Sequence, residues 1–129
     1  MVNRKQAEAM VSKWQNRLGL QDWRIVLEFN SDGGLDSGHD MCIVWPRGYQ
    51  TGTIHIKAET LMLERWRFER DIVHELLHLC LAPMTDELER LVGDSSVIYD
   101  TVDRACERTV DKLATVIERG WKDGRSRRS

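Results

Sequence analysis

Residues 72–81 read Ile72-Val73-His74-Glu75-Leu76-Leu77-His78-Leu79-Cys80-Leu81. Only the two histidines and the glutamate interrupt this apolar run, so a helix formed by it is predicted to pass through the core. Burying three polar side chains without partners costs about 1–3 kcal/mol each. One metal ion would satisfy all three.

The three polar residues have the spacing H-E-x-x-H. His74 and His78 are four residues apart, so on a helix they share one face at about 5–6 Å, and both can reach one ion at the usual zinc–nitrogen distance of about 2.0–2.1 Å. Glu75 lies beside that face, where it can deprotonate a zinc-bound water without displacing it. The alternative is a pair of hydrogen-bonded core histidines with Glu75 in a local ion pair. The pattern favours one zinc ion with Glu75 as the catalytic base.

Hydrophobic periodicity elsewhere predicts an α+β fold. The helical period is expected in the segments 3–18, 68–81, 86–91 and 95–119, the last ending at Gly120. Strands are expected at 23–29, 41–45 and 53–57, with a Gly- and Asp-rich loop at 31–40. The expected architecture is an N-terminal helix, a small, mostly antiparallel sheet of about three strands, the motif helix and a long C-terminal helix.

Length and composition set the remaining bounds. The 129 residues suit a single domain over residues 1–120, followed by a basic, disordered tail at 121–129. A net charge of −2 gives no general attraction to nucleic acid or anionic membrane, and no apolar run is long enough to span a bilayer. The three cysteines, Cys42, Cys80 and Cys106, are odd in number and lie among apolar residues, which favours free thiols in a reducing compartment. We expect a cytoplasmic monomer with no nucleic-acid or membrane partner.

A catalytic zinc site takes three protein ligands and keeps a fourth position for water. The chain has four histidines: His39, His55, His74 and His78. None follows the motif, which excludes patterns with a third histidine downstream. The metzincin pattern needs a glycine at position 81 and a histidine at 84, where this chain has Leu81 and Met84.

Downstream, the remaining donors are carboxylates and one thiol. Asp103, Glu107 and Asp111 are spaced by four, which aligns them along one side of the C-terminal helix. Cys106 belongs to the adjoining apolar stripe, so Glu107 lies at the edge of the buried face. These carboxylates are either zinc donors or a solvated acidic face paired with neighbouring basic residues, and the spacing alone leaves both interpretations open.

The segment Glu107-Arg108-Thr109-Val110-Asp111 has the pattern E-x-x-x-D. H-E-x-x-H followed by E-x-x-x-D on a later helix resembles the gluzincins, the thermolysin-like metallopeptidases. Over residues 72–114 the chain is similar to the very small metallopeptidases of phage and prophage genomes. The resemblance implies a minimal zincin-like fold, zinc ligated by His74, His78 and Glu107, and Glu75 as the base. It also implies that Asp111 accepts an N–H from a ligand histidine; Asp103 and Cys106 remain the alternative donors.

Two side chains outside the motif are candidates for the hydrogen-bond donor that stabilises the oxyanion. Tyr99 lies two helical turns before Glu107, and its alternative role is at the edge of the core. His55 faces opposite to its strand neighbours Ile54 and Ile56, towards either the surface or a cleft. The strand at 53–57 is expected to be an exposed edge that binds a peptide by main-chain pairing.

The sequence therefore predicts a zinc metallopeptidase that hydrolyses a peptide or protein substrate through a zinc-bound water activated by Glu75. One alternative is a non-catalytic zinc-binding interaction module. A structural site has no use for a base and normally closes its fourth position with Cys or His, so Glu75 argues against it. The other alternative is an interaction domain in which the motif is accidental, and three polar residues at core positions argue against that.

Overall fold

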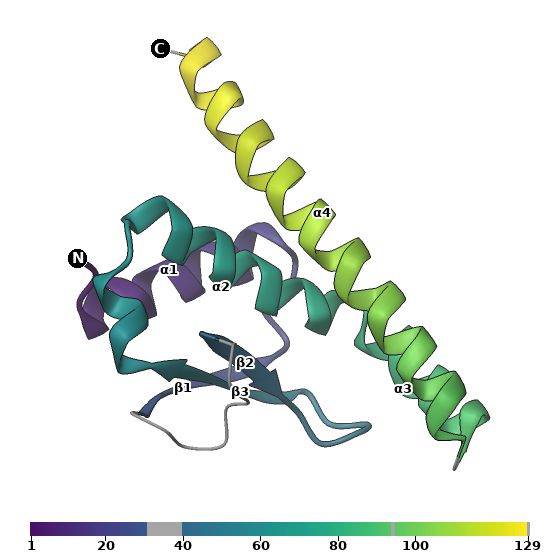
Figure 1. Cartoon of the computed structure of the whole chain (residues 1–129). Helices are drawn as coiled ribbons and strands as arrows, with labels where there is room; N and C mark the ends of the chain where they lie inside the picture. The colour runs from purple at the N-terminus through teal and green to yellow at the C-terminus, as the bar shows by residue number, and fades with distance from the viewer. Residues whose placement is uncertain (31–39, 94, 129) are drawn as a thin grey trace.

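The computed structural model describes residues 1–30, 40–93 and 95–128 (Figure 1). Along the chain the elements are α1 (Arg4–Arg17), β1 (Arg24–Asn30), β2 (Met41–Val44), β3 (Thr51–Lys57), the 3-10 helix η1 (Ala58–Met62), α2 (Arg65–Cys80), α3 (Ala82–Val92) and α4 (Ser96–Arg128). The predicted α+β class, with a helix before the sheet and a long helix at the end, is confirmed. Of the predicted loop at 31–40 only Asp40 is described, and His39 lies outside the described residues.

The described strands form one sheet in the order β1-β3-β2. β3 pairs in parallel with β1 and antiparallel with β2, so the sheet is mixed rather than mostly antiparallel. The central position of β3 also corrects the expectation that residues 53–57 form an exposed edge. Alternation along a strand shows which face is buried but not which strands pair. The complete burial of Ile54 and Ile56 suits a strand with a neighbour on each side.

The hydrophobic core lies between the sheet and the helices α1 and α2, which cover the same face (Figure 1). The motif helix is the centre of this core, because Phe68, Ile72, Val73 and Leu76 are completely buried along it. This confirms the prediction that the H-E-x-x-H segment runs through the core. No helix in the described part of the chain is long and apolar enough to cross a membrane.

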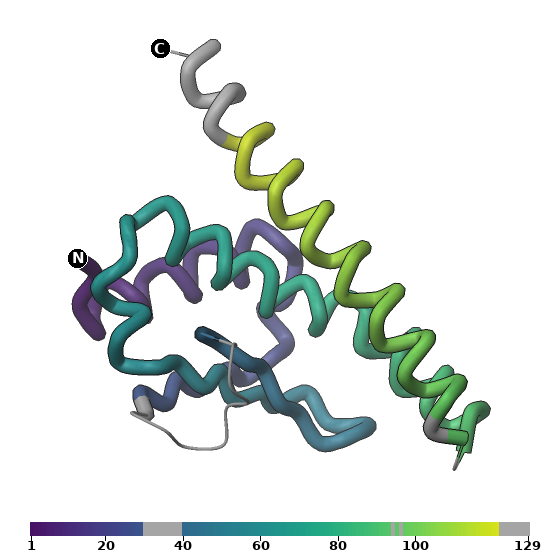
Figure 2. Tube along the Cα trace, viewed as in Figure 1, coloured from purple at the N-terminus to yellow at the C-terminus, as the bar shows by residue number. Residues whose placement is uncertain are grey.

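Pro83 explains why α2 ends where it does. A proline has no N–H to donate to the carbonyl four residues earlier, so it interrupts a helix, but it fits the first turn of a new helix, where its missing N–H needs no partner. α2 ends at Cys80, and Pro83 lies in the first turn of α3. The short helix predicted at 86–91 is thus longer, at Ala82–Val92, and it lies beside the N-terminal part of α4 (Figure 2).

α4 crosses α2 and does not end at Gly120 as predicted, but continues to Arg128. The helix end expected at Gly120 is therefore wrong. A glycine inside a helix costs only about 1 kcal/mol relative to alanine. Contacts beyond Gly120 offset such a cost: the ring of Trp121 meets the ring of Trp14 edge-on at 5.7 Å, and the Arg17 guanidinium lies 4.2 Å from the Trp121 ring centroid.

Candidate metal centre

α2 presents both motif histidines to α4. Their spacing of four residues places the two rings on one face, with ring centroids 5.1 Å apart. Each side chain is largely buried, 19% exposed for His74 and 14% for His78. The two imidazoles therefore lie close enough to bind the same ion, as predicted.

Glu107 of α4 completes the group. Its Oε2 lies 3.2 Å from Nε2 of His74, and its Oε1 lies 2.9 Å from Nε2 of His78. One ligand atom from each of the three residues lies within 4.8 Å of the others. In a tetrahedral site with bonds of about 2.0–2.1 Å, neighbouring ligand atoms are about 3.3 Å apart. These three residues could therefore hold a metal ion after small adjustments of the side chains.

The structure also separates Glu107 from the alternative donors. Among the described side chains, no other group of three or more histidines, cysteines and carboxylates meets this geometry. Asp103 and Cys106 are not part of the group; both line a pocket that His78 also lines. From the residues alone the third donor stayed open, because several candidate donors share the same stretch of helix. The crossing of α2 and α4 decides which of them faces the histidines.

Charges around the group favour a cation. Hydrogen bonds with His74 and His78 hold the pKa of the Glu107 carboxyl far below its usual range, although partial burial opposes this. Burial lowers the pKa of His74, but the hydrogen bond with Glu107 and the charges of Glu75, Glu107 and Asp111 outweigh that effect and raise the pKa overall. Metal binding requires neutral histidines and an ionised carboxylate, so a metal ion competes with protons here.

Glu75 lies beside the ligand group without belonging to it. The residue is only 7% exposed, and this burial raises the pKa of its carboxyl to about 7, against the opposing influence of His74 and His78. A general base works best when its pKa lies near the pH at which the reaction runs. A carboxyl with this pKa can both accept and donate a proton near neutral pH.

Asp111, which was predicted to accept an N–H from a ligand histidine, faces Nδ1 of His74. Its Oδ1 lies 3.6 Å from Nδ1 of His74, which is within ion-pair range but long for a hydrogen bond. Thus His74 directs Nε2 towards Glu107 and Nδ1 towards Asp111. This arrangement fits an acceptor that fixes the orientation of a ligand histidine.

A cleft opens over the group. It is lined by the motif residues His74, Glu75 and His78, by Glu107, and by the whole of β2. β2 is an edge strand of the described sheet and runs beside the ligands. Of the two edge strands of the described sheet, β1 and β2, it is β2 that lines this cleft, in place of the predicted segment 53–57.

Of the two predicted oxyanion donors, only Tyr99 lies at the cleft. Tyr99 of α4 lines the same cleft as the ligand group. His55 lines a different pocket, on the sheet face away from α2, and its Nδ1 lies 3.3 Å from Oε2 of Glu28. The structure therefore does not bring His55 to the site. The reason is strand alternation: Ile54 and Ile56 take the face towards α2, and His55 must take the other.

Sequence reasoning missed the outer wall of the cleft. Trp45 and Arg47 follow β2, and Asp86 and Glu89 come from α3. Nε1 of Trp45 donates to Oδ1 of Asp86 at 3.2 Å, which joins the two segments. These residues have no shared motif or spacing, so no pattern in the sequence could have found them.

No protein-family model matches the chain, and no curated protein or solved structure matches it either. The function must therefore be inferred from the residues of the site themselves.

Proposed function

We propose that this chain is a zinc-dependent metallopeptidase of the gluzincin type, which hydrolyses peptide bonds in a peptide or protein substrate. The observation that carries the proposal is the convergence of His74, His78 and Glu107 within 4.8 Å, with the buried carboxyl of Glu75 beside them in an open cleft. A group built only to stabilise the fold has no need of a base or of an open side.

The donor set supports zinc as the metal. Two imidazoles and one carboxylate are a ligand set that zinc takes in hydrolytic sites, with one further position left for water or substrate. When bound, zinc supplies a Lewis acid that lowers the pKa of water and polarises a carbonyl oxygen. His74, His78 and Glu107 would hold the ion, and Asp111 would orient His74.

The remaining steps belong to side chains of the chain. Glu75 accepts a proton from the attacking water and afterwards gives it to the leaving amine. Burial and the nearby charges of Glu89, Asp103 and Asp100 raise the pKa of Tyr99, so its hydroxyl stays protonated at neutral pH and can donate to the developing oxyanion. β2 is an edge strand of the described sheet, and its outer side offers main-chain groups that hold an extended substrate across the cleft.

The test compares three forms of the full chain after removal of metal and repletion with zinc: wild type, Glu75→Gln, and Glu8→Gln as a control on the exposed face of α1. Zinc content and hydrolysis of an unstructured polypeptide are measured for each. We expect one zinc ion per chain in all three, with activity at least about 100-fold lower in Glu75→Gln only.

Two results would overturn the proposal. Full zinc occupancy of the wild type without hydrolysis of any peptide in a diverse library would favour the non-catalytic zinc-binding module. Equal activity of wild type and Glu75→Gln would remove Glu75 as the base.

A further inference from the structure

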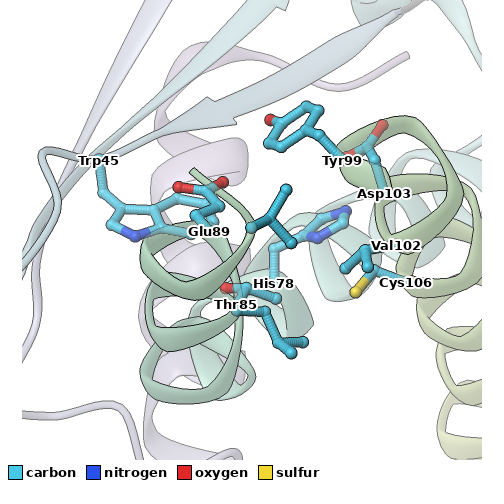
Figure 3. Close-up of a pocket in the computed structure, with 10 residues that line it drawn as sticks. Trp45, His78, Thr85, Glu89, Tyr99, Val102, Asp103 and Cys106 are labelled. Atoms are coloured by element: carbon cyan, nitrogen blue, oxygen red, sulfur yellow. The ribbon is translucent and has the colours of Figure 1, made fainter. Parts of the chain in front are cut away.

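A second pocket adjoins the metal centre, between α3 and α4 (Figure 3). It holds about 460 Å³ of empty space, counting its open mouth. Leu88 and Val92 of α3 and Val102 of α4 form apolar walls. His78, one of the candidate metal ligands, lines this pocket as well as the main cleft. A substrate held in the cleft would therefore have one side chain at the entrance of this pocket, next to the bond that is cleaved.

The entrance is made of five residues that line both spaces: Trp45, His78, Glu89, Tyr99 and Asp103. Apart from His78, two of them are aromatic and two are acidic. Figure 3 shows Trp45 and Glu89 of α3 on one side of the entrance, and Tyr99 and Asp103 of α4 on the other. Aromatic faces and carboxylates are the two kinds of protein group that attract organic cations most strongly.

Of the two carboxylates at the entrance, only Glu89 has a cationic partner among the described residues. None of the residues lining the pocket is a lysine or an arginine. In the described part of the chain, no salt bridge joins Asp103 to a basic side chain. Glu89 and Asp103 act together on the Tyr99 hydroxyl, since the charge of each raises the pKa of Tyr99. Both carboxylates also line the same pocket and the same cleft.

A guanidinium already lies at this entrance. Nη2 of Arg47 is 3.6 Å from Oε2 of Glu89, a long ion pair between side chains that are 55% and 36% exposed. Such an exposed pair contributes little stability, and a cation on a substrate can replace it. Arg47 thus shows the chemistry that the entrance accepts, and it competes for the same carboxylate.

We propose that the entrance formed by Trp45, Glu89, Tyr99 and Asp103 selects a lysine or arginine side chain adjacent to the scissile bond. The aliphatic stem of that side chain would lie on Trp45 and the apolar wall, and its cationic end would reach the two carboxylates. This inference rests on the proposed peptidase function, because it places the selected side chain beside a bond that is cleaved. The selection of a cation can nevertheless be measured without hydrolysis.

The first measurement uses hydrolysis by the zinc-loaded full chain. Two peptides differ only at the position beside the cleaved bond, which carries lysine in one and norleucine in the other. We expect kcat/KM to favour lysine about tenfold in the wild type. Glu89→Gln and Asp103→Asn should each reduce this ratio several-fold. Arg47→Ala should increase it, and Glu87→Gln, an exposed residue of α3 paired with Arg90, should leave it unchanged.

The second experiment measures, by fluorescence anisotropy, the binding of the same two peptides to the zinc-loaded Glu75→Gln variant. Tighter binding of the lysine peptide, with the preference lost when Glu89→Gln is added, supports the inference. This holds even if the wild type hydrolyses no peptide, and in that case only the peptidase proposal fails. Equal binding of the two peptides, together with cleavage that ignores lysine and arginine, overturns the inference and leaves the peptidase proposal standing. An increase in lysine preference in Glu89→Gln would also overturn it.

Discussion

His74 and Glu107 are 33 positions apart in the chain, yet Nε2 of His74 lies 3.2 Å from Oε2 of Glu107. This contact exists because α4 packs across α2. Val110, one turn after Glu107, and Ala114, one turn further, are both completely buried in the core. Packing of these two small residues fixes the rotation of α4, and that rotation directs Glu107 towards the histidines.

Replacing Glu107 tests this assignment directly. Glu107→Ala removes one of three ligands, so we expect zinc affinity to fall by more than the about 10–100-fold that the loss of an outer partner costs. Affinity is measured by competition with a chromophoric chelator, with Asp100→Ala, an exposed carboxylate on the same helix, as the control. Unchanged affinity in Glu107→Ala, with a loss in Asp103→Asn or Cys106→Ser, would transfer the third ligand to one of those residues.

Replacing Asp111 should also lower zinc affinity, but by less than replacing Glu107. Asp111→Asn keeps the side-chain size but removes the charge that faces Nδ1 of His74. Loss of such a partner typically costs about 10–100-fold in metal affinity. Because the contact is 3.6 Å long and the Asp111 side chain is 73% exposed, we expect a value near tenfold. The zinc content at saturation should stay at one ion per chain, and an affinity equal to that of the wild type would contradict the role.

The motif helix could be predicted from sequence because its signals are local. The apolar run over residues 72–81 specifies burial, and the four-residue spacing specifies which side chains share a face. Both properties depend on one helix alone. The structure bears them out in the burial of Leu76 and in the neighbouring rings of His74 and His78.

Features that depend on the packing of separate elements could not be predicted in the same way. Alternation placed Ile54 and Ile56 inside correctly, but it could not place β3 between β1 and β2, so the expected edge strand was wrong. The entrance residues Trp45 and Glu89 line one pocket because Trp45, which follows β2, lies against α3, where Asp86 accepts its hydrogen bond. The end predicted at Gly120 was also wrong, since a contact with Trp14 on a distant helix supports Trp121.

Two glycines offer a prediction about stability. A methyl group added at Gly52 would lie 3.6 Å from Cδ1 of Ile43 and 3.7 Å from Cδ1 of Leu79, which is ordinary contact distance. Gly93 follows α3 with φ of 62°, a conformation that side chains with a Cβ rarely adopt. We expect Gly52→Ala to raise the free energy of unfolding by about 0.4–1 kcal/mol. Gly93→Ala should lower it by about 1–3 kcal/mol.

Urea unfolding followed by circular dichroism measures both variants. The Cβ added by Gly93→Ala would meet no atom within 4 Å, so any loss of stability comes from backbone strain and not from a clash. A stabilised Gly93→Ala or a strongly destabilised Gly52→Ala would contradict the described backbone at these positions.

The contact between Glu69 and α1 predicts how stability depends on pH. Oε1 of Glu69 accepts a hydrogen bond from Nε1 of Trp14 at 2.7 Å and forms a salt bridge with Lys13. Burial raises the pKa of Glu69, but these hydrogen bonds and the charges of Lys13 and Arg65 outweigh it, so the pKa lies below its ordinary value of 4.5. A folded-state pKa below the unfolded one means that ionised Glu69 stabilises the fold above about pH 4.5. That stability is lost as the pH falls from there through the lower folded-state pKa.

Glu69→Gln removes this dependence. At pH 7 we expect the variant to be less stable than the wild type by about 1.5–3 kcal/mol, the usual contribution of hydrogen bonds to a charged group. Below pH 4.5 the difference should shrink, because the wild type then protonates Glu69 and loses the same charge. Urea unfolding of both proteins between pH 7 and pH 3 measures the difference. A difference that stays constant over this range would show that ionised Glu69 does not join α1 to α2 in this way.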